Sequence, residues 1–465
     1  MKNNVYSGKN AIKDYINPHN HMTPLVELDD KCNPFRKNGI RIFAKLQNTL
    51  PLLNIKSIPA YEMINSAHIQ KKLQNKPTII ENSSGNTAYS LGIIGRHYGL
   101  NSMKAFVSNE VTKNKLNMLR LFGITPIINN EPICPDPDDE NSGIYKAKQM
   151  AKSEKYINFG QYDNLNNPNS HSLITGKQIW IQTNGKIDIF CSGLGTTGTF
   201  LGTSNYLKKK NDNLKAIGVI RKPNNLVPGV RTKNLLKMIA FDWKNNADDI
   251  IEIGSVESYT QSLKLIRSGL LVGPSSGFAL AGLLEYIKRN KLKNKTCVFI
   301  CYDTPLPYLD EYFSYLPTSD FPKVINKELL PYEITTKHTK DKVDSITVTK
   351  LYKILKETYS EKLNTDIKRN PNNIFIDLRI ENKFGDYHIP GFTNIPMDAF
   401  IKNYKQKIKK ENNIYLICET GEKSFKAAKN LIIEGYNAIH ISGGTIAWSN
   451  KKYPRIKNEE CVFLK

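Results

Sequence analysis

Short apolar runs alternate with longer helix-like segments between about residues 75 and 300, and this alternation constrains the fold more than any other feature of the chain. An apolar run at 77–81 precedes a polar turn and a helix-like segment at 89–98. Further along, a glycine turn leads into a helix-like segment at 200–210, and the apolar run 215–220 follows it. Strands that alternate with helices usually form a mostly parallel sheet with helices on both faces. The sequence therefore predicts an α/β fold.

A second, smaller α/β unit is expected near the C-terminal end of the 465-residue chain. This length exceeds what one hydrophobic core usually supports, which indicates two or more domains. A polar segment at 331–344 has no hydrophobic periodicity and is typical of a linker. Strands of the second unit are expected at 374–378, 414–418 and 438–441. We therefore predict domains at 1–330 and 345–460.

Composition argues against several classes of protein. The net charge of +23 comes mostly from lysines spread along the chain, without a basic arm or interleaved aromatic residues, so a nucleic-acid partner is not expected. Because no apolar run is long enough to cross a membrane and the first residues lack a signal-peptide core, we expect a cytoplasmic protein without a membrane partner. The seven cysteines have neither disulfide-framework nor metal-site spacing, so we expect reduced thiols and no metal.

A glycine-rich turn, Gly193–Thr199, follows an apolar run. Such a turn between a strand and a helix gathers unpaired backbone N–H groups on one anion, and the helix dipole favours the negative charge. Gly193, Gly195 and Gly198 also satisfy the dinucleotide pattern G-x-G-x-x-G, but a nicotinamide site needs an acidic residue at the end of the next strand. Arg221 stands there instead, so the turn predicts a phosphate site of another kind.

Six segments in the first 325 residues resemble those of the fold-type II pyridoxal-phosphate enzymes, the family of cysteine synthase and cystathionine β-synthase. These segments are 44–46, 54–60, 81–87, 161–168, 271–277 and 302–304. They occur in the order that the family expects. The resemblance implies pyridoxal 5′-phosphate as cofactor, two doubly wound subdomains with parallel or mixed sheets, small amino-acid and sulfur substrates, and a homodimer.

The same resemblance implies roles for individual side chains. Lys56 matches the lysine that forms the Schiff base with the cofactor, and Asn86 matches the residue that bonds the ring hydroxyl. Thr304 matches the hydroxyl that faces the ring nitrogen, where a neutral partner would favour loss of a β-substituent over transamination. The phosphate loop matches Gly195, Thr196, Thr197, Gly198 and Thr199. The residues that hold the substrate carboxylate match Ser83, Ser84, Thr87 and Gln161.

Two departures from the family pattern lie beside these residues. Where the family has N-P-G-G-S-x-K-D-R, the chain has Leu-Pro-Leu-Leu-Asn-Ile-Lys-Ser-Ile at 50–58, so both glycines and the acid are replaced. Thr197 stands where the phosphate loop has glycine. These replacements predict a more apolar wall beside the cofactor and a divergent acceptor substrate.

A second candidate site begins at Cys418, which opens the loop Cys-Glu-Thr-Gly-Glu-Lys-Ser after an apolar run. Backbone N–H groups of such a loop at the head of a helix would point at the sulfur and stabilise its anionic form. Taken alone, a cysteine at a strand end is more often a core residue. With the segments 376–379, 387–396 and 442–448, however, it resembles the single-domain rhodanese pattern. That resemblance implies that Cys418 carries sulfane sulfur.

Three residues of this loop depart from the rhodanese pattern. Glu419 and Glu422 bring negative charge near the sulfur, which disfavours a thiolate. Lys423 replaces the usual arginine, so the forked grip on an anion is lost. We therefore expect slow turnover at this site, or a protein persulfide as its partner.

Together the two resemblances predict an enzyme of sulfur metabolism with two catalytic units. The first would replace the β-substituent of an activated serine with a sulfur nucleophile, as in cysteine synthase, and Cys418 of the second would supply or receive the sulfur. A cysteine desulfhydrase, a β-lyase that passes sulfur to Cys418, is the alternative of the same class. A sulfur carrier or regulatory scaffold, in which both pockets have lost catalysis, is the alternative of a different class.

Overall fold

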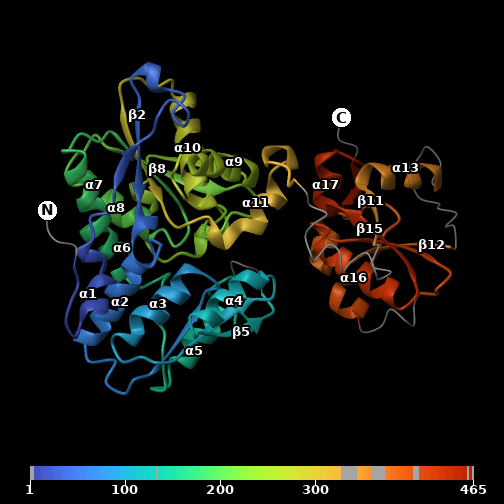
Figure 1. Ribbon diagram of the computed structural model, residues 1–465, viewed down its shortest axis with the longest axis horizontal. Helices are drawn as coiled ribbons and strands as arrows, with labels where there is room; N and C mark the ends of the chain where they lie inside the picture. Colours follow the sequence, from blue (N-terminus) through green and yellow to red (C-terminus); the bar gives the residue numbers. More distant parts are fainter. Residues whose placement is uncertain are drawn as a thin grey trace. The chain divides into compact units, whose positions relative to one another are not determined.

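The computed structural model describes residues 5–131, 135–325, 343–358, 372–401, 408–457 and 460–462, in two compact units, Met1–Pro322 and Lys323–Lys465. The linker expected at 331–344 lies outside the described residues except for its last two positions, and strand β11 (Asp344–Thr347) begins at the last of these. Each unit combines parallel strands with helices (Figure 1), which confirms the predicted α/β class.

The described strands of the first unit form two sheets. The larger sheet has the order β1-β2-β10-β7-β8-β9, and only β1 runs antiparallel to its neighbour. Its strands are β1 (Leu25–Glu27), β2 (Arg41–Leu46), β7 (Ile189–Gly193), β8 (Lys215–Arg221), β9 (Asp249–Ile253) and β10 (Thr296–Cys301). The smaller sheet is fully parallel in the order β5-β4-β3-β6. Its strands are β3 (Thr78–Asn82), β4 (Met103–Ser108), β5 (Thr125–Asn129) and β6 (Tyr156–Ile157).

Helices pack against these sheets (Figure 1). The described α-helices of the first unit are α1 (Ala11–Tyr15), α2 (Ser57–Ile69), α3 (Asn86–Arg96), α4 (Lys113–Leu121), α5 (Gly143–Met150), α6 (Asn166–His171), α7 (Lys177–Gln182), α8 (Gly198–Lys208), α9 (Ser255–Arg267), α10 (Pro274–Arg289) and α11 (Leu309–Tyr315). A π-helical turn at Ser172–Gly176 joins α6 to α7. The helix expected at 200–210 starts two residues earlier, because the last glycine of the turn already belongs to it.

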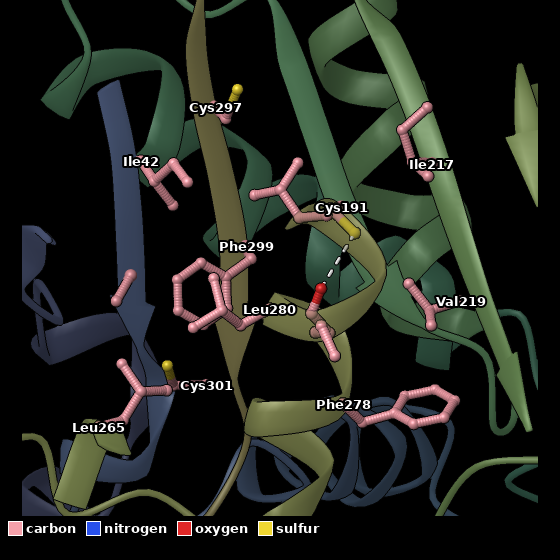
Figure 2. Packing of buried hydrophobic residues seen from close by; sticks show 14 of the residues in the cluster. Ile42, Cys191, Ile217, Val219, Leu265, Phe278, Leu280, Cys297, Phe299 and Cys301 are labelled. Carbon is pink, nitrogen blue, oxygen red and sulfur yellow. Dashed lines mark hydrogen bonds between the residues drawn. The ribbon is translucent and has the colours of Figure 1, made fainter. Parts of the chain in front are cut away.

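Side chains of β10 alternate between two hydrophobic cores, one on each face of the larger sheet. Cys297, Phe299 and Cys301 face the core that α9 and α10 cover (Figure 2), whereas Val298 and Ile300 face the core that includes residues of α8. A strand buried on both faces is apolar at every position, so its sequence does not show the usual polar alternation. Burial raises the pKa of both the Cys297 and the Cys301 thiols, which leaves them unreactive.

The second unit has one parallel sheet in the order β11-β15-β14-β12-β13, with a separate antiparallel pair, β16 and β17. The remaining strands are β12 (Asn373–Asp377), β13 (Thr393–Asn394), β14 (Asn413–Ile417), β15 (Asn437–Ser442), β16 (Arg455–Lys457) and β17 (Glu460–Val462). The described helices are α13 (Val348–Thr358), α14 (Glu381–Asp386), α16 (Glu422–Ile433) and α17 (Gly444–Asn450). The three strands expected from sequence are present, and β14 ends one residue earlier than expected, just before Cys418.

Candidate functional site

A cavity open to solvent lies at the carboxyl ends of β7 and β10, and the space free of protein atoms in it and at its mouth is about 520 Å³. In open α/β sheets, ligands usually bind at this edge. The cavity is lined by Ile55, Lys56, Asn86, Gly193, Gly195, Thr196, Thr197, Thr199, Pro228, Gly229, Val230, Ser275, Tyr302, Asp303 and Tyr308. It therefore brings together the predicted Schiff-base lysine, the predicted ring-hydroxyl partner and most of the predicted phosphate loop.

Lys56 directly precedes α2 and is fixed against the end of β10. The backbone N–H of Ile55 donates to the carbonyl of Tyr302 (2.8 Å), and Asn54 pairs with Asp303 in an isolated antiparallel bridge. Removal from water lowers the pKa of the Lys56 amine to about 8, because a desolvated ammonium is disfavoured. A neutral amine is therefore accessible near neutral pH, as a nucleophile or base requires.

A second buried lysine, Lys45 of β2, does not line the cavity. Its Nζ donates to the carbonyl oxygen of Thr23 (2.7 Å) and to the side-chain oxygens of Gln178 (2.7 Å) and Gln182 (2.8 Å). Burial lowers the pKa of this amine to about 7, but three acceptors already surround it. Of the two lysines, Lys56 is the one placed to meet a ligand.

The predicted phosphate loop lies at the N-terminus of α8, where backbone N–H groups lack helical partners. At Gly195 a Cβ would come within 2.0 Å of the carbonyl oxygen of Gly229, so a larger residue cannot replace it without a shift. Thr197 has a φ of 66°, and its buried hydroxyl has no hydrogen-bond partner among the described residues. Gly198 does not line the cavity, and a Cβ there would meet the side chain of Asn167. The loop therefore fits a phosphate group and leaves one hydroxyl free to donate to it.

His171 supports this loop, although no individual role was predicted for it from the sequence. Its Nε2 lies 3.1 Å from Oγ1 of Thr199, and its Nδ1 lies 3.0 Å from Oγ1 of Thr175. Burial, and after it the charge of Lys56, lower the pKa of His171 to about 3, so the imidazole is neutral. It therefore orients the Thr199 hydroxyl. The spacing of four residues between His171 and Thr175 was the available signal in the sequence.

Asn86, the first residue of α3, belongs to a buried polar network. Its side-chain amide donates to Oδ2 of Asp303 (2.6 Å), and the hydroxyl of Tyr308 donates to the same oxygen (2.7 Å). The hydroxyl of Tyr89 donates to Oδ1 of Asn86. Burial raises the pKa of Asp303 to about 6, although both donors lower it. The other carboxylate oxygen, Oδ1, has no partner among the described residues.

The residues predicted to hold a substrate carboxylate are not among those that line the cavity. Thr87 donates to the side-chain oxygen of Gln161 (2.8 Å), and both residues are buried next to each other. Ser83 and Ser84 lie in the turn between β3 and α3 and are partly exposed. The structure therefore brings Gln161 to Thr87, which follows Asn86 in the chain, and leaves Ser83 and Ser84 partly exposed in the turn.

Thr304, predicted to face the ring nitrogen, is also not among the cavity residues. Ser275, in the first turn of α10, lines the cavity instead and is 7% exposed. A neutral hydroxyl therefore reaches the cavity, but from a different segment of the chain. Ser275 belongs to 271–277, a segment that carried the family resemblance without a role for any single residue.

The loop before Lys56 lacks the glycines of the family pattern. Leu53 stands at a glycine position and has a φ of 56°, a left-handed conformation that costs a residue with a side chain about 1–2 kcal/mol. Its side chain is 52% exposed, so packing offsets little of this cost. Ile55 lines the cavity and Leu50 is buried in the core beside it, whereas Leu52 and Leu53, which replace the glycines, are not among the lining residues.

In the second unit, Cys418 follows β14 and is 2% exposed. The backbone N–H groups of Gly421 (3.2 Å) and Ser424 (3.4 Å) donate to its sulfur. Gly421 has a φ of 99°, which lets the loop turn into α16. The loop thus has the arrangement of N–H donors around sulfur that the sequence predicts.

Ser424 and His440 extend this site beyond the loop. The hydroxyl oxygen of Ser424 lies 3.5 Å from the sulfur of Cys418 and 3.0 Å from Nδ1 of His440. Burial lowers the pKa of His440. Ser424 therefore connects the thiol to a neutral imidazole on β15, a contact that the sequence did not reveal.

The acidic residues of the loop have partners among the lysines. Glu419 pairs with Lys383 of α14, and Glu422 pairs with Lys426 (2.9 Å). Such exposed pairs add only about 0–1 kcal/mol to stability, but each lysine offsets a charge that would oppose a thiolate. Lys423 is exposed.

The described residues contain neither a metal-binding cluster nor a membrane-spanning helix. Within the described ranges, no group of three or more His, Cys, Asp or Glu side chains is placed to hold a metal ion. None of the helices in the described part of the chain is long and apolar enough to cross a membrane.

Comparison with known proteins gives similarity to two families. Residues 16–303 match the family described as pyridoxal-phosphate dependent enzyme, and residues 360–451 match the rhodanese-like domain. Cysteine synthase B of Escherichia coli (strain K12) is 28% identical over 269 residues, which cover 58% of this chain and 86% of that protein. Cysteine synthase of Buchnera aphidicola subsp. Schizaphis graminum (strain Sg) is 30% identical over 313 residues, 63% of this chain and 93% of that protein. The crystal structure of a hydrogen sulfide-producing enzyme from Fusobacterium nucleatum is 26% identical, with a TM-score of 0.56, and covers 65% of this chain and 98% of that one.

Proposed function

Since the chain belongs to the family of pyridoxal-phosphate dependent enzymes and carries a rhodanese-like domain after that region, we propose that its first unit replaces the β-substituent of an activated serine with a sulfur nucleophile. The relatives named cysteine synthase support this class of reaction. The cavity carries the proposal, because it combines the amine of Lys56, with its lowered pKa, and an anion-binding loop at 195–199.

The donors and acceptors around the cavity fit pyridoxal phosphate. The cofactor supplies an electron sink, which labilises the α-proton and the β-substituent of an amino acid. The N–H groups at 195–199 would hold its phosphate, and the amide of Asn86 and the hydroxyl of Ser275 would meet polar atoms of its ring. Lys56 Nζ would accept and return the α-proton, since its lowered pKa leaves a neutral base near neutral pH.

The amino-acid carboxylate would bind at the N-terminus of α3. There, Thr87 and Gln161 already hold each other, and Ser83 and Ser84 lie in the preceding turn. The turn would have to move towards the cavity for its serines to contact a substrate. Closure of this turn would also exclude water from the reacting atoms.

For the second unit, we propose that Cys418 carries sulfane sulfur. Its thiolate would attack the outer sulfur of a donor such as thiosulfate, so that the donor S–S bond breaks, sulfite leaves and a persulfide forms on Cys418. A thiol would then attack the inner sulfur of this persulfide, releasing sulfide and leaving a mixed disulfide that a second thiol reduces. This sequence would supply the nucleophile that the first unit consumes.

Elimination of sulfide from cysteine is the second candidate, because the Fusobacterium relative is described as hydrogen sulfide-producing. In that reaction Lys56 would move the same proton, but no nucleophile would add. Sulfide has the oxidation level of a thiol, so its capture as a persulfide on Cys418 would need an oxidant. The need for an oxidant therefore favours the hypothesis that Cys418 supplies sulfide to the first unit over the hypothesis that it accepts sulfide from that unit.

Steady-state assays of the full chain with added pyridoxal phosphate separate the two candidates. We expect the protein to form cysteine from O-acetylserine and sulfide. The Lys56→Ala variant should lose this activity by about 10²–10⁴-fold, because the base is removed. Lys209→Ala, at an exposed lysine directly after α8, is the matched control and should retain activity. Turnover of cysteine alone, without synthesis, would contradict the replacement reaction.

Borohydride reduction followed by peptide mapping should label Lys56, and a label elsewhere would contradict its role.

A homodimer is proposed on the family resemblance. The first unit exposes large apolar side chains, among them Leu121, Leu165 and Leu173, that a second copy could cover. A molecular mass from sedimentation of twice the 52.8 kDa of one chain would support a dimer. The mass of a single chain at all concentrations would contradict it.

A further inference from the structure

Asp303 lies in the cavity without a role in the reaction proposed above. It is 3% exposed, lines the cavity and follows β10 by two residues. Its backbone pairs with Asn54, two residues before Lys56. The carboxylate is therefore held on the same rigid segment as the lysine, and its place is fixed by backbone pairing.

The hydrogen bonds of Asn86 determine which polar atom it can offer to a ligand. A side-chain amide has two N–H donors and one carbonyl acceptor. The hydroxyl of Tyr89 donates to the carbonyl, and Oδ2 of Asp303 accepts one N–H at 2.6 Å. An ionised carboxylate can only accept, so it requires the nitrogen end of the amide to face it. The group that Asn86 retains for the cavity is therefore its second N–H.

We propose that Asp303 is a positioning residue that holds the Asn86 amide with an N–H, rather than its carbonyl, towards the ring oxygen of pyridoxal phosphate. This inference rests on the proposed function of the first unit. A donor stabilises the ring oxygen when the ring hydroxyl has lost its proton, whereas a carbonyl oxygen repels it. Asp303 thus sets the ionisation of the cofactor's ring hydroxyl through the Asn86 amide.

The network also predicts a dependence on pH. Burial raises the pKa of Asp303 to about 6, and a neutral carboxyl can donate to the amide carbonyl and allow the amide to turn. The titratable groups that face this carboxyl are Tyr89, Tyr259, Cys301, Tyr308, Tyr312 and Lys115. Burial raises the pKa of the tyrosines and of the cysteine, so they stay neutral, while the charge of Lys115 favours the carboxylate. The absorption of the bound cofactor should therefore change as pH falls through about 6.

The test compares two ligands on the full-length apoprotein: pyridoxal phosphate and its 3-deoxy analogue, which lacks the ring hydroxyl. Asp303→Asn keeps the size of the side chain but can donate to the carbonyl of Asn86. We expect this variant to bind pyridoxal phosphate about tenfold more weakly, through loss of one hydrogen bond to a charged oxygen. Binding of the deoxy analogue should change by less than about twofold, since it has no oxygen for Asn86 to meet. Asp310→Asn, an exposed acid seven residues later, should match the unaltered protein with both ligands.

The outcomes separate this inference from the proposed function. The positioning role is overturned if Asp303→Asn loses affinity equally for both ligands, or if it loses affinity for neither. If the unaltered protein binds no pyridoxal phosphate, the proposed function fails together with this inference. Tyr308→Phe keeps the carboxylate but removes a donor that lowers its pKa, so the spectral transition should move to higher pH. An unmoved transition in Tyr308→Phe overturns the proposal even if Asp303→Asn does not fold.

Discussion

Both candidate sites use a loop between a strand and the N-terminus of a helix, yet the residue before each helix differs. Thr197 precedes α8 with a φ of 66°, and Gly421 precedes α16 with a φ of 99°. Each loop needs this left-handed conformation to aim its N–H groups at one point. Glycine adopts it without steric cost, whereas threonine loses about 1–2 kcal/mol.

The difference reflects what each loop holds. In the first unit the loop faces a cavity, and the buried hydroxyl of Thr197 is left for an external ligand. In the second unit the loop closes on the sulfur of its own chain, and a Cβ at position 421 would lie 3.1 Å from the backbone nitrogen of Gly443 and 3.2 Å from the ring of His440. Strained residues persist where they serve a ligand. Of these two loops, the one that faces a cavity has a threonine in the left-handed conformation, and the one that closes on its own sulfur has a glycine.

The largest effect is expected from Gly421→Val, which adds a branched side chain where none fits. We expect a loss of about 2–3 kcal/mol in the stability of the second unit, and a fall in thiosulfate-dependent sulfur transfer of about 100-fold because the N–H donors shift. Gly435→Ala is the matched control, since Gly435 also has a positive φ (86°) but lies after the other end of α16. It should lose stability and keep most of the transfer rate. Equal loss of transfer in both variants would refute a specific role for the loop.

Thr197→Gly tests the strained side of the comparison. The variant should raise the melting temperature of the apoprotein by relieving strain, yet bind pyridoxal phosphate about fivefold to tenfold more weakly by losing a hydroxyl. Thr197→Val keeps the branched side chain and the strain but not the hydroxyl, so it should weaken binding without a gain in stability. Isothermal titration and thermal unfolding measure both quantities. Unchanged affinity in either variant would show that the hydroxyl does not contact the phosphate.

A smaller effect is expected from Leu53→Gly, which removes strain away from any ligand. Leu53 is 52% exposed, so its replacement costs little packing. The relief of strain exceeds the entropy that glycine adds to the unfolded chain, and the free energy of unfolding should rise by about 0.5–1 kcal/mol. Cofactor affinity should not change. Leu53→Ala remains strained and should gain little. Denaturant unfolding measures the stability of both variants. An increase in the free energy of unfolding in Leu53→Ala alone would argue against backbone strain at this position.

The smallest effect is expected from Ser424→Ala, which removes the hydroxyl between Cys418 and His440. Alkylation of Cys418 by iodoacetamide should slow about threefold, because the polar hydroxyl 3.5 Å from the sulfur is lost. Ser345→Ala, an exposed serine of β11, is the control and should leave the rate unchanged. Peptide mass mapping follows Cys418 separately from the other cysteines. A faster reaction would mean that Ser424 shields the thiol instead of activating it.

Sequence patterns identified those parts of the sites that lie within one segment. Lys56 was located through the family resemblance of the segment 54–60. The turn at 195–199 and the loop after Cys418 were located because each combines a strand end, a turn and a helix start within about ten residues. The network at Asp303 escaped notice because Asn86 lies 217 positions earlier in the chain. The family resemblance predicted Thr304 as the partner of the ring nitrogen, whereas Ser275, which had no predicted role, is the one of the two that lines the cavity.

The order of residues alone therefore specifies the α/β class, the two units and the family, because periodicity and contiguous motifs depend on local backbone preferences. Packing in three dimensions decides that Ser275 lines the cavity, that the Asn86 amide contacts Asp303, and that Ser424 meets His440. These features depend on contacts between side chains far apart in the chain, whose register follows from how strands and helices pack against one another.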